Sequence, residues 1–204
     1  MPPFRRKSAA RPSFLPVVFL LALPCAAHAR GSFDHYRQIT RSERAPSDTA
    51  VSLAGAQAVV AFSPNGGGTR LIVRAIDHAR QQVLVQAYSF TSRPILRALV
   101  EAHGRGVDVE VILDHSDLRG RHAGASDMVS HGIPVWIDTR VRIAHNKVMI
   151  LDGRNVLTGS FNFSWSAQHL NAENVLEIKD APSLARAYLR DWRWRQSLSR
   201  KVKE

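Results

Sequence analysis

The chain has 204 residues, of which 45% are apolar and 22% are charged. This composition is typical of one globular domain and excludes a disordered, collagenous or polytopic membrane protein. The single cysteine, Cys25, excludes a disulfide scaffold and a cysteine-based zinc site. The formal net charge of +11 favours polyanionic partners, namely nucleic acid or an anionic membrane surface.

The first 29 residues have the parts of a secretory signal sequence. A basic start precedes an apolar run from Phe14 to Leu23, and Ala27-His28-Ala29 is an A-x-A cleavage site. The run is too short to span a bilayer. We therefore expect cleavage near Ala29-Arg30 and export to the periplasm or the medium. Removing this segment takes away four basic and no acidic residues, so the formal net charge of the mature chain is +7.

Residues 30–54 are polar and aperiodic and are interpreted as a linker or mobile arm, so that the predicted folded domain is 55–204. Within that domain, apolar runs with strand spacing alternate with runs that have helical spacing. We expect strands at Ala58–Phe62, Val83–Phe90, Val107–Leu113, Pro134–Ile137, Val148–Leu151, Asn155–Thr158 and Asn174–Ile178, and helices at Thr69–Arg80, from Ser92 to Ala102, at Ser126–His131 and at Pro182–Ser197.

Alternating strands and helices predict an α/β fold in which helices cover both faces of one sheet. Asp152-Gly153 stands between two short apolar runs and predicts a β-hairpin. The hairpin makes the expected sheet mixed rather than purely parallel. The expected architecture is a single α/β/α sandwich.

Two pairs of polar residues flank this hairpin. His145 and Lys147 enter its first strand, and Ser160 and Asn162 follow its second strand. Residues two apart in an extended chain point to the same side, so the pairs are expected to converge. An imidazole can attack phosphorus, while an ammonium, a hydroxyl and an amide can hold phosphate oxygens. Glu173 is a candidate acceptor for the other ring N–H of His145.

Carboxylates do not cluster around this histidine in the sequence. Mg²⁺ and catalytic Zn²⁺ are usually held by such clusters or by several histidines. We therefore expect no metal site and no cofactor.

The motifs resemble those of the phospholipase D superfamily, most of all its small secreted bacterial nucleases, the Nuc-type endonucleases. They are His145-x-Lys147-x₄-Asp152, Gly159-Ser160-x-Asn162-x-Ser164 and Asn171-x-Glu173-Asn174. The resemblance implies a phospholipase D-like α/β/α sandwich and metal-independent phosphodiesterase chemistry.

The resemblance also implies a role for each residue of the motifs. His145 is expected to be the covalent nucleophile, Lys147 and Asn162 phosphate ligands, Ser160 a supporting donor and Glu173 the partner of His145. Asp152 belongs to the motif, but it sits in the Asp-Gly turn, so we expect a structural role for it.

The chain carries one H-x-K motif. The chemistry of the family needs two histidines on opposite sides of phosphorus, one to attack and one to protonate the leaving alkoxide. We therefore expect a homodimer in which two copies share one active site across a two-fold axis. Two imidazoles that flank one phosphate are expected to share a proton, since the doubly charged pair repels itself.

The expected function is hydrolysis of phosphodiester bonds through a phosphohistidine, most consistent with a secreted, non-specific endonuclease that acts on nucleic acid, above all DNA. One alternative is a phospholipase D that acts on phospholipid head groups, although we identify no strongly apolar surface segment. Another is a non-catalytic polyanion-binding module, which would not need a nucleophile. Two further features stay open: Asp114-His115, interpreted as a loop, and the segment from Trp192 to Arg195, whose Trp192 is expected in the core.

Overall fold

The computed structural model describes residues 49–119 and 124–203. The predicted signal sequence of residues 1–29 and most of the predicted linker, 30–54, lie outside this part of the chain. The described residues form a single α/β domain around an eight-stranded sheet with the strand order β1-β7-β6-β5-β2-β3-β4-β8. Parallel pairing joins β2 to β3 and β3 to β4, and all other neighbours are antiparallel. The predicted mixed sheet is therefore confirmed.

The predicted strands and helices all occur, with ends that shift by a few residues. The strands are β1 Gln57–Ser63, β2 Gln82–Ala87, β3 Asp108–Asp114, β4 Val135–Asp138, β5 Lys147–Leu151, β6 Asn155–Gly159, β7 Glu173–Lys179 and β8 Arg200–Lys201. The helices are α1 Gly68–His78, α2 Arg93–Gly104, the 3₁₀ helix η2 His115–Arg119, α3 Gly124–Ser130, α4 Trp165–His169 and α5 Pro182–Leu198.

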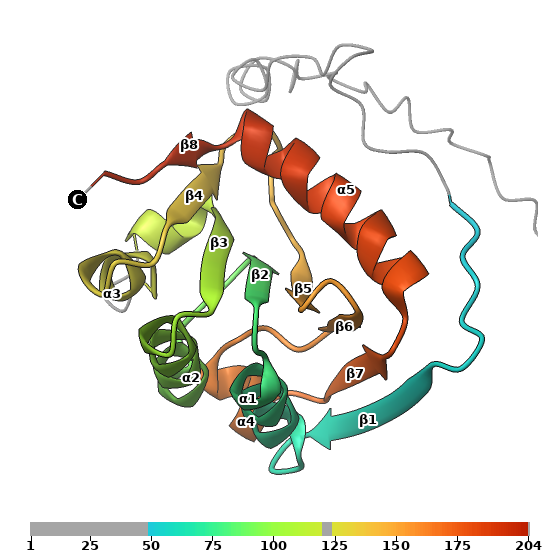
Figure 1. The fold of residues 1–204 in the computed structure, drawn as a ribbon. Helices are drawn as coiled ribbons and strands as arrows, with labels where there is room; N and C mark the ends of the chain where they lie inside the picture. Colours follow the sequence, from blue (N-terminus) through green and yellow to red (C-terminus); the bar gives the residue numbers. More distant parts are fainter. Residues whose placement is uncertain (1–48, 120–123, 204) are drawn as a thin grey trace, which may run out of the picture. The chain divides into compact units, whose positions relative to one another are not determined.

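Helices cover both faces of the sheet, with α1, α2 and α3 on one face and α5 on the other (Figure 1). The alternation of side chains along β2 shows why. Val83 and Val85 pack in the core under α1 and α2. Leu84 packs in a second core, together with Ala185 and Trp192 of α5. A strand buried on both faces is apolar at successive positions, as the sequence of β2 is.

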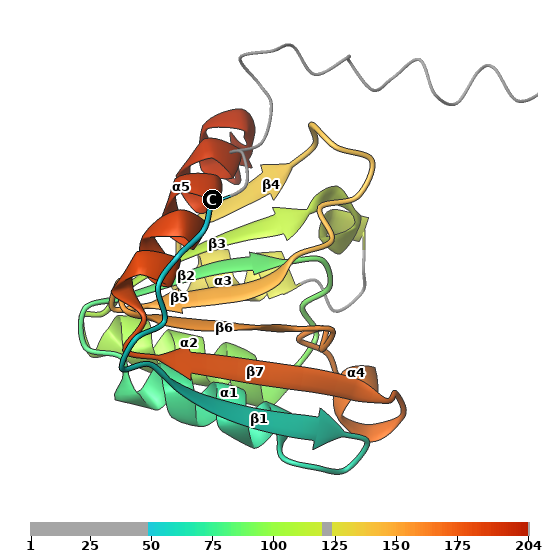
Figure 2. The same cartoon turned by 90° about the vertical axis from the view of Figure 1, so that its right-hand side faces the viewer.

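The ends of several strands and the starts of others lie together at one end of the sheet. In Figure 2, β2, β3 and β4 finish at the right-hand end, where β5 and β7 begin and α4 lies. The register agrees, because Ala87 at the end of β2 pairs with Lys147 at the start of β5, and Gly159 at the end of β6 pairs with Val175 near the start of β7. Residues that are distant in the sequence therefore meet at this end.

The structure corrects three expectations about element ends. The strand expected to reach Phe90 stops at Ala87, and Phe90 makes only an isolated bridge with Phe163. The helix expected at Thr69–Arg80 begins one residue earlier, with Gly67 at the N-cap position, and ends at His78. The helix expected from Ser92 to Ala102 reaches Gly104, and Ser92 holds its N-cap position without a capping hydrogen bond from the side chain.

Three elements were not predicted. Both α4 and η2 have only five residues, too few to show a helical period. The two residues of β8 pair with β4 and cover the edge of the sheet.

Candidate active site

His145 and Lys147 stand at the start of β5, with Tyr88 from the end of β2 against both. The His145 side chain is exposed, whereas Lys147 is only 7% exposed. The Lys147 Nζ donates a hydrogen bond to the His145 carbonyl at 3.0 Å and lies 5.4 Å from the centroid of the Tyr88 ring. That ring is 4.8 Å from the His145 ring, centroid to centroid. Tyr88 therefore orients both members of the first predicted pair.

The charge of Lys147 is poorly compensated. Burial lowers the pKa of Lys147, and the nearby negative charge of Glu173 partly offsets that effect. A buried ammonium with a carbonyl and an aromatic ring around it still has donor capacity. The arrangement can accept an anionic ligand beside the His145 ring.

Ser160 is held by Asn174 across the start of the β6–β7 connection. The backbone N–H of Ser160 donates to the Asn174 carbonyl at 3.1 Å. The Ser160 Oγ in turn accepts hydrogen bonds from the backbone N–H of Asn174 at 3.1 Å and from its side-chain Nδ2 at 3.4 Å. Gly159 permits this contact, because a Cβ atom there would lie 2.2 Å from the Asn174 carbonyl oxygen. The hydroxyl of Ser160 accepts twice, so its own proton is available to a ligand.

Asn162 lies two residues further along. Its Oδ1 is buried and has no hydrogen-bond partner among the described residues. Most buried polar atoms are paired, and an unpaired one is costly. The Asn162 Oδ1 is thus not committed to a partner within the part of the chain that the structure describes.

Glu173, the first residue of β7, makes no hydrogen bond or ion pair with the His145 ring among the described residues. Its Oε1 accepts a hydrogen bond from the Asn171 Nδ2 at 3.0 Å, and its charge acts on Lys147. The structure therefore places Glu173 at the same end of the sheet as His145 and Lys147. Its pairing with the imidazole of His145 stays a prediction.

Asp152 lies at the opposite end of β5. A five-residue strand separates it from the site by about 17 Å along the strand. The Asp152 carboxylate accepts the backbone N–H groups of Arg80, Gln81 and Gln82 at 2.8–3.1 Å, and its φ is +52°. These bonds join the hairpin to the connection between α1 and β2. They support the structural role predicted for Asp152.

Sequence reasoning missed Asp114, which was interpreted as part of a loop. The residue ends β3 and is 1% exposed. Its carboxylate accepts the Ala144 N–H at 2.8 Å and the Ser116 N–H at 2.9 Å. Burial raises the pKa of Asp114, but the hydrogen bonds from Ser116 and Ala144 outweigh it and leave the pKa below its ordinary value. Asp114 therefore fixes the backbone directly before His145.

Exposed apolar side chains gather at this end of the sheet, which no single stretch of sequence revealed. Phe62 at the end of β1 is 62% exposed, and Trp165 and Leu170 beside α4 are 58% and 65% exposed. The Asn65 N–H donates to the Gln168 carbonyl and links the two segments. Trp192, by contrast, is buried, as expected, and its Nε1 donates to the Val85 carbonyl at 3.1 Å.

Two negative observations hold for residues 49–119 and 124–203. Nowhere in these ranges do three His, Cys, Asp or Glu side chains group in a way that could ligate a metal ion. None of the helices in these ranges is long and apolar enough to cross a bilayer.

Comparisons with known proteins agree with this geometry. Residues 72–194 match the family described as "Cardiolipin synthase, PLD-like domain". A phospholipase D of Rickettsia prowazekii is 43% identical over 141 residues, which are 69% of this chain and 68% of the relative. A mitochondrial cardiolipin hydrolase of Xenopus laevis is 32% identical over 61% of this chain and 58% of its own length.

Among solved structures, the crystal structure of Nuc from Salmonella typhimurium, a phospholipase D family member, superposes with a TM-score of 0.71. The two sequences are 37% identical, and the match covers 73% of this chain and 99% of Nuc. The chain therefore belongs to the phospholipase D superfamily and is a phosphodiesterase of that superfamily.

Proposed function

We propose that this chain is an exported, non-specific nuclease that hydrolyses nucleic acid through a phosphohistidine, without a metal ion. The observation that carries the proposal is the exposed imidazole of His145 beside the buried ammonium of Lys147. The imidazole is accessible to a phosphorus atom, and the ammonium is placed to hold its oxygens.

In the first step, a ring nitrogen of His145 attacks phosphorus while the bond to the leaving oxygen breaks. A second imidazole, in its protonated form, gives its proton to that oxygen. In the second step, the same imidazole removes a proton from water, and the water oxygen displaces His145 from phosphorus. Lys147, Asn162 and the proton of Ser160 hold the phosphate oxygens in both steps. The cycle returns both imidazoles to their initial states.

The second imidazole is His145 of a second copy of the chain. The sequence holds one H-x-K motif, so a homodimer with a shared site supplies the missing acid. Subunit exchange tests this point. If an inactive His145→Asn chain is mixed with an equal amount of wild type, random exchange should lower total activity to about half. Unchanged activity after proven exchange contradicts the shared site.

Nucleic acid is favoured as the substrate by charge. The mature chain has a net charge of +7, and a polynucleotide offers successive anionic phosphates. The likeness to Nuc over 99% of its length also favours nucleic acid, because the motifs of this chain resemble those of the Nuc-type endonucleases. The second candidate substrate is phospholipid. It is favoured by the exposed Phe62, Trp165 and Leu170 and by the similarity to a phospholipase D and a cardiolipin hydrolase.

One assay separates these substrates. The chain without residues 1–29 is offered plasmid DNA, RNA and phosphatidylcholine vesicles in parallel, each with EDTA. We expect cleavage of DNA that the chelator does not inhibit and no release of choline. A requirement for a divalent cation contradicts the mechanism, and choline release without nuclease activity selects the lipid substrate. His145→Asn is the control for contaminating nucleases.

A further inference from the structure

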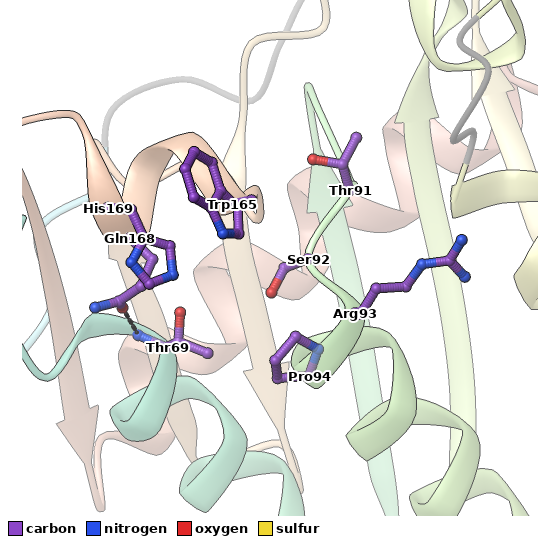
Figure 3. Close-up of a pocket in the computed structure, with 8 residues that line it drawn as sticks. All are labelled: Thr69, Thr91, Ser92, Arg93, Pro94, Trp165, Gln168 and His169. Carbon is purple, nitrogen blue, oxygen red and sulfur yellow. Dashed lines mark hydrogen bonds between the residues drawn. The ribbon is translucent and has the colours of Figure 1, made fainter. Parts of the chain in front are cut away.

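A cavity of about 450 Å³ opens beside the site, between α4 and the first turns of α1 and α2 (Figure 3). None of the residues that line it is among the proposed catalytic and phosphate-binding residues. Its wall includes Thr69, Ser92, Pro94, Trp165, Gln168 and His169. The cavity has the size of a site for a small planar ligand rather than for a diacyl lipid.

Two short connections tie this cavity to the phosphate site. Phe163, which follows Asn162, has a carbonyl that accepts the N–H groups of Thr91 and Ser92, both at 2.9 Å. Thr91 is in turn three residues from Tyr88, the ring against His145. Three residues of extended chain span at most about 10 Å. A group bound in the cavity is therefore a near neighbour of a phosphate bound at Lys147.

The cavity presents an aromatic platform. The indole of Trp165 is 58% exposed, and the His169 ring lies 4.7 Å from it at an interplanar angle of 32°. Figure 3 shows the indole at the edge of the cavity, across from Ser92. An open aromatic ring beside a basic phosphate site is a stacking surface for a nucleobase.

Two hydroxyl groups lie in the otherwise largely apolar lining of the cavity. Ser92 is 4% exposed, and its hydroxyl, which makes no capping hydrogen bond to α2, points into the cavity in Figure 3. The Thr69 hydroxyl also faces the cavity in this view. Gln168 makes the cavity rigid, because its Oε1 accepts the Thr69 N–H at 2.9 Å and its Nε2 donates to the Gly66 carbonyl at 3.0 Å.

We infer that this cavity is a nucleobase subsite, which stacks on Trp165 the base of a nucleotide next to the scissile phosphate and meets its polar edge with Ser92. The inference rests on the proposed nuclease function. A base supplies both a flat face and edge donors or acceptors. An acyl chain would bury the Ser92 hydroxyl without a partner, which is unfavourable.

The experiment uses two single-stranded oligonucleotides with one cleavable phosphodiester each, the other linkages being phosphorothioate. In one, thymidines flank the cleavable bond, and in the other, abasic sugars do. We expect Trp165→Ala to lower kcat/KM on the thymidine substrate about tenfold and to leave the abasic substrate unchanged. Trp165→Phe should restore most of the loss, and Ser92→Ala should cause a smaller loss confined to the thymidine substrate.

Leu170→Ala is the matched control, because Leu170 is 65% exposed beside the same helix but does not line the cavity. It should behave as wild type on both substrates. Equal losses of Trp165→Ala on both substrates, or no loss on either, overturn the subsite. So does a Trp165→Ala chain that sediments as a monomer, or one whose loss appears only in phosphatidylcholine hydrolysis. If the wild type cleaves neither oligonucleotide, the proposed function itself fails, and the subsite fails with it.

Discussion

The two ends of β5 carry the two halves of one motif and differ in how completely their polar groups are paired. At the Asp152 end, one carboxylate accepts three successive backbone N–H groups. At the His145 end, the Lys147 ammonium donates to one carbonyl and lies near the Tyr88 ring and the charge of Glu173, and the Asn162 Oδ1 has no partner among the described residues. The contrast separates a paired end that holds the fold from an unpaired end that is prepared for a ligand.

The difference teaches that residues adjacent in a motif need not share a role. A five-residue strand carries the chain from one end of the sheet to the other, so the motif marks both a reactive edge and its anchor. Unpaired polar groups at a functional edge cost stability, which paired groups elsewhere offset. Substitutions at the two ends should therefore affect different measurements.

The largest effect is expected from His145→Asn. Loss of the nucleophile should lower kcat on DNA by about 10³-fold or more, since no other group can form the covalent intermediate. The melting temperature should stay within about 2 °C of wild type, because the side chain is exposed. Turnover within tenfold of wild type, measured on protein of equal stability, would remove His145 from the chemistry.

Lys147 should give the next largest effect, and with a characteristic pH dependence. Lys147→Met should lower kcat/KM about 10²-fold through lost charge at phosphate. The pKa of Lys147 is lowered by burial, so the cation and the activity should be lost as pH rises through that lowered value, below the ordinary 10.5. Lys147→Arg, if active, should lack this alkaline loss, because a guanidinium stays charged.

Stability should move in the opposite direction over the same pH range. Where Lys147 is neutral in the folded state and still protonated in the unfolded state, a rise in pH stabilises the fold. The melting temperature of wild type should therefore rise relative to that of Lys147→Met as pH approaches 10.5 from below. If wild type and Lys147→Arg lose activity identically as pH rises, the alkaline loss of activity belongs to a group other than Lys147.

Much of this division was predictable from the sequence, for physical reasons. The Asp152-Gly153 turn predicted the hairpin because both positions need a positive φ, and they have φ of +52° and +63°. The spacing of His145 and Lys147 predicted one shared edge. The Asp114–Ala144 bond could not be predicted, since it joins positions 30 residues apart. The placement of Trp165 at the same end of the sheet as Phe62 depends on α4, which has too few residues to show a period.

Asp152 should affect stability without affecting the chemistry. Asp152→Ala leaves three backbone N–H groups without their acceptor and places an alanine at a positive φ, so we expect a loss of about 2–3 kcal/mol in the free energy of unfolding. Asp152→Asn keeps one acceptor oxygen and tolerates that φ, so it should lose less. Denaturant unfolding measures both variants. A lowered kcat, measured at denaturant concentrations where the variant is still folded, would contradict the separation of the two ends.

The smallest effect, and the sharpest test of the comparison, comes from Asp114, which is paired like Asp152 but lies at the His145 end. Its carboxylate holds the Ala144 N–H directly before His145. Asp114→Asn should therefore lower kcat by about three- to tenfold with little change in KM, because the imidazole is mispositioned while the phosphate ligands are intact. It should also lower stability by about 1 kcal/mol, an effect that fades in acid as the wild-type carboxylate protonates through its lowered pKa. If only stability falls, as expected for Asp152, then pairing alone decides a residue's role and its position along the strand does not.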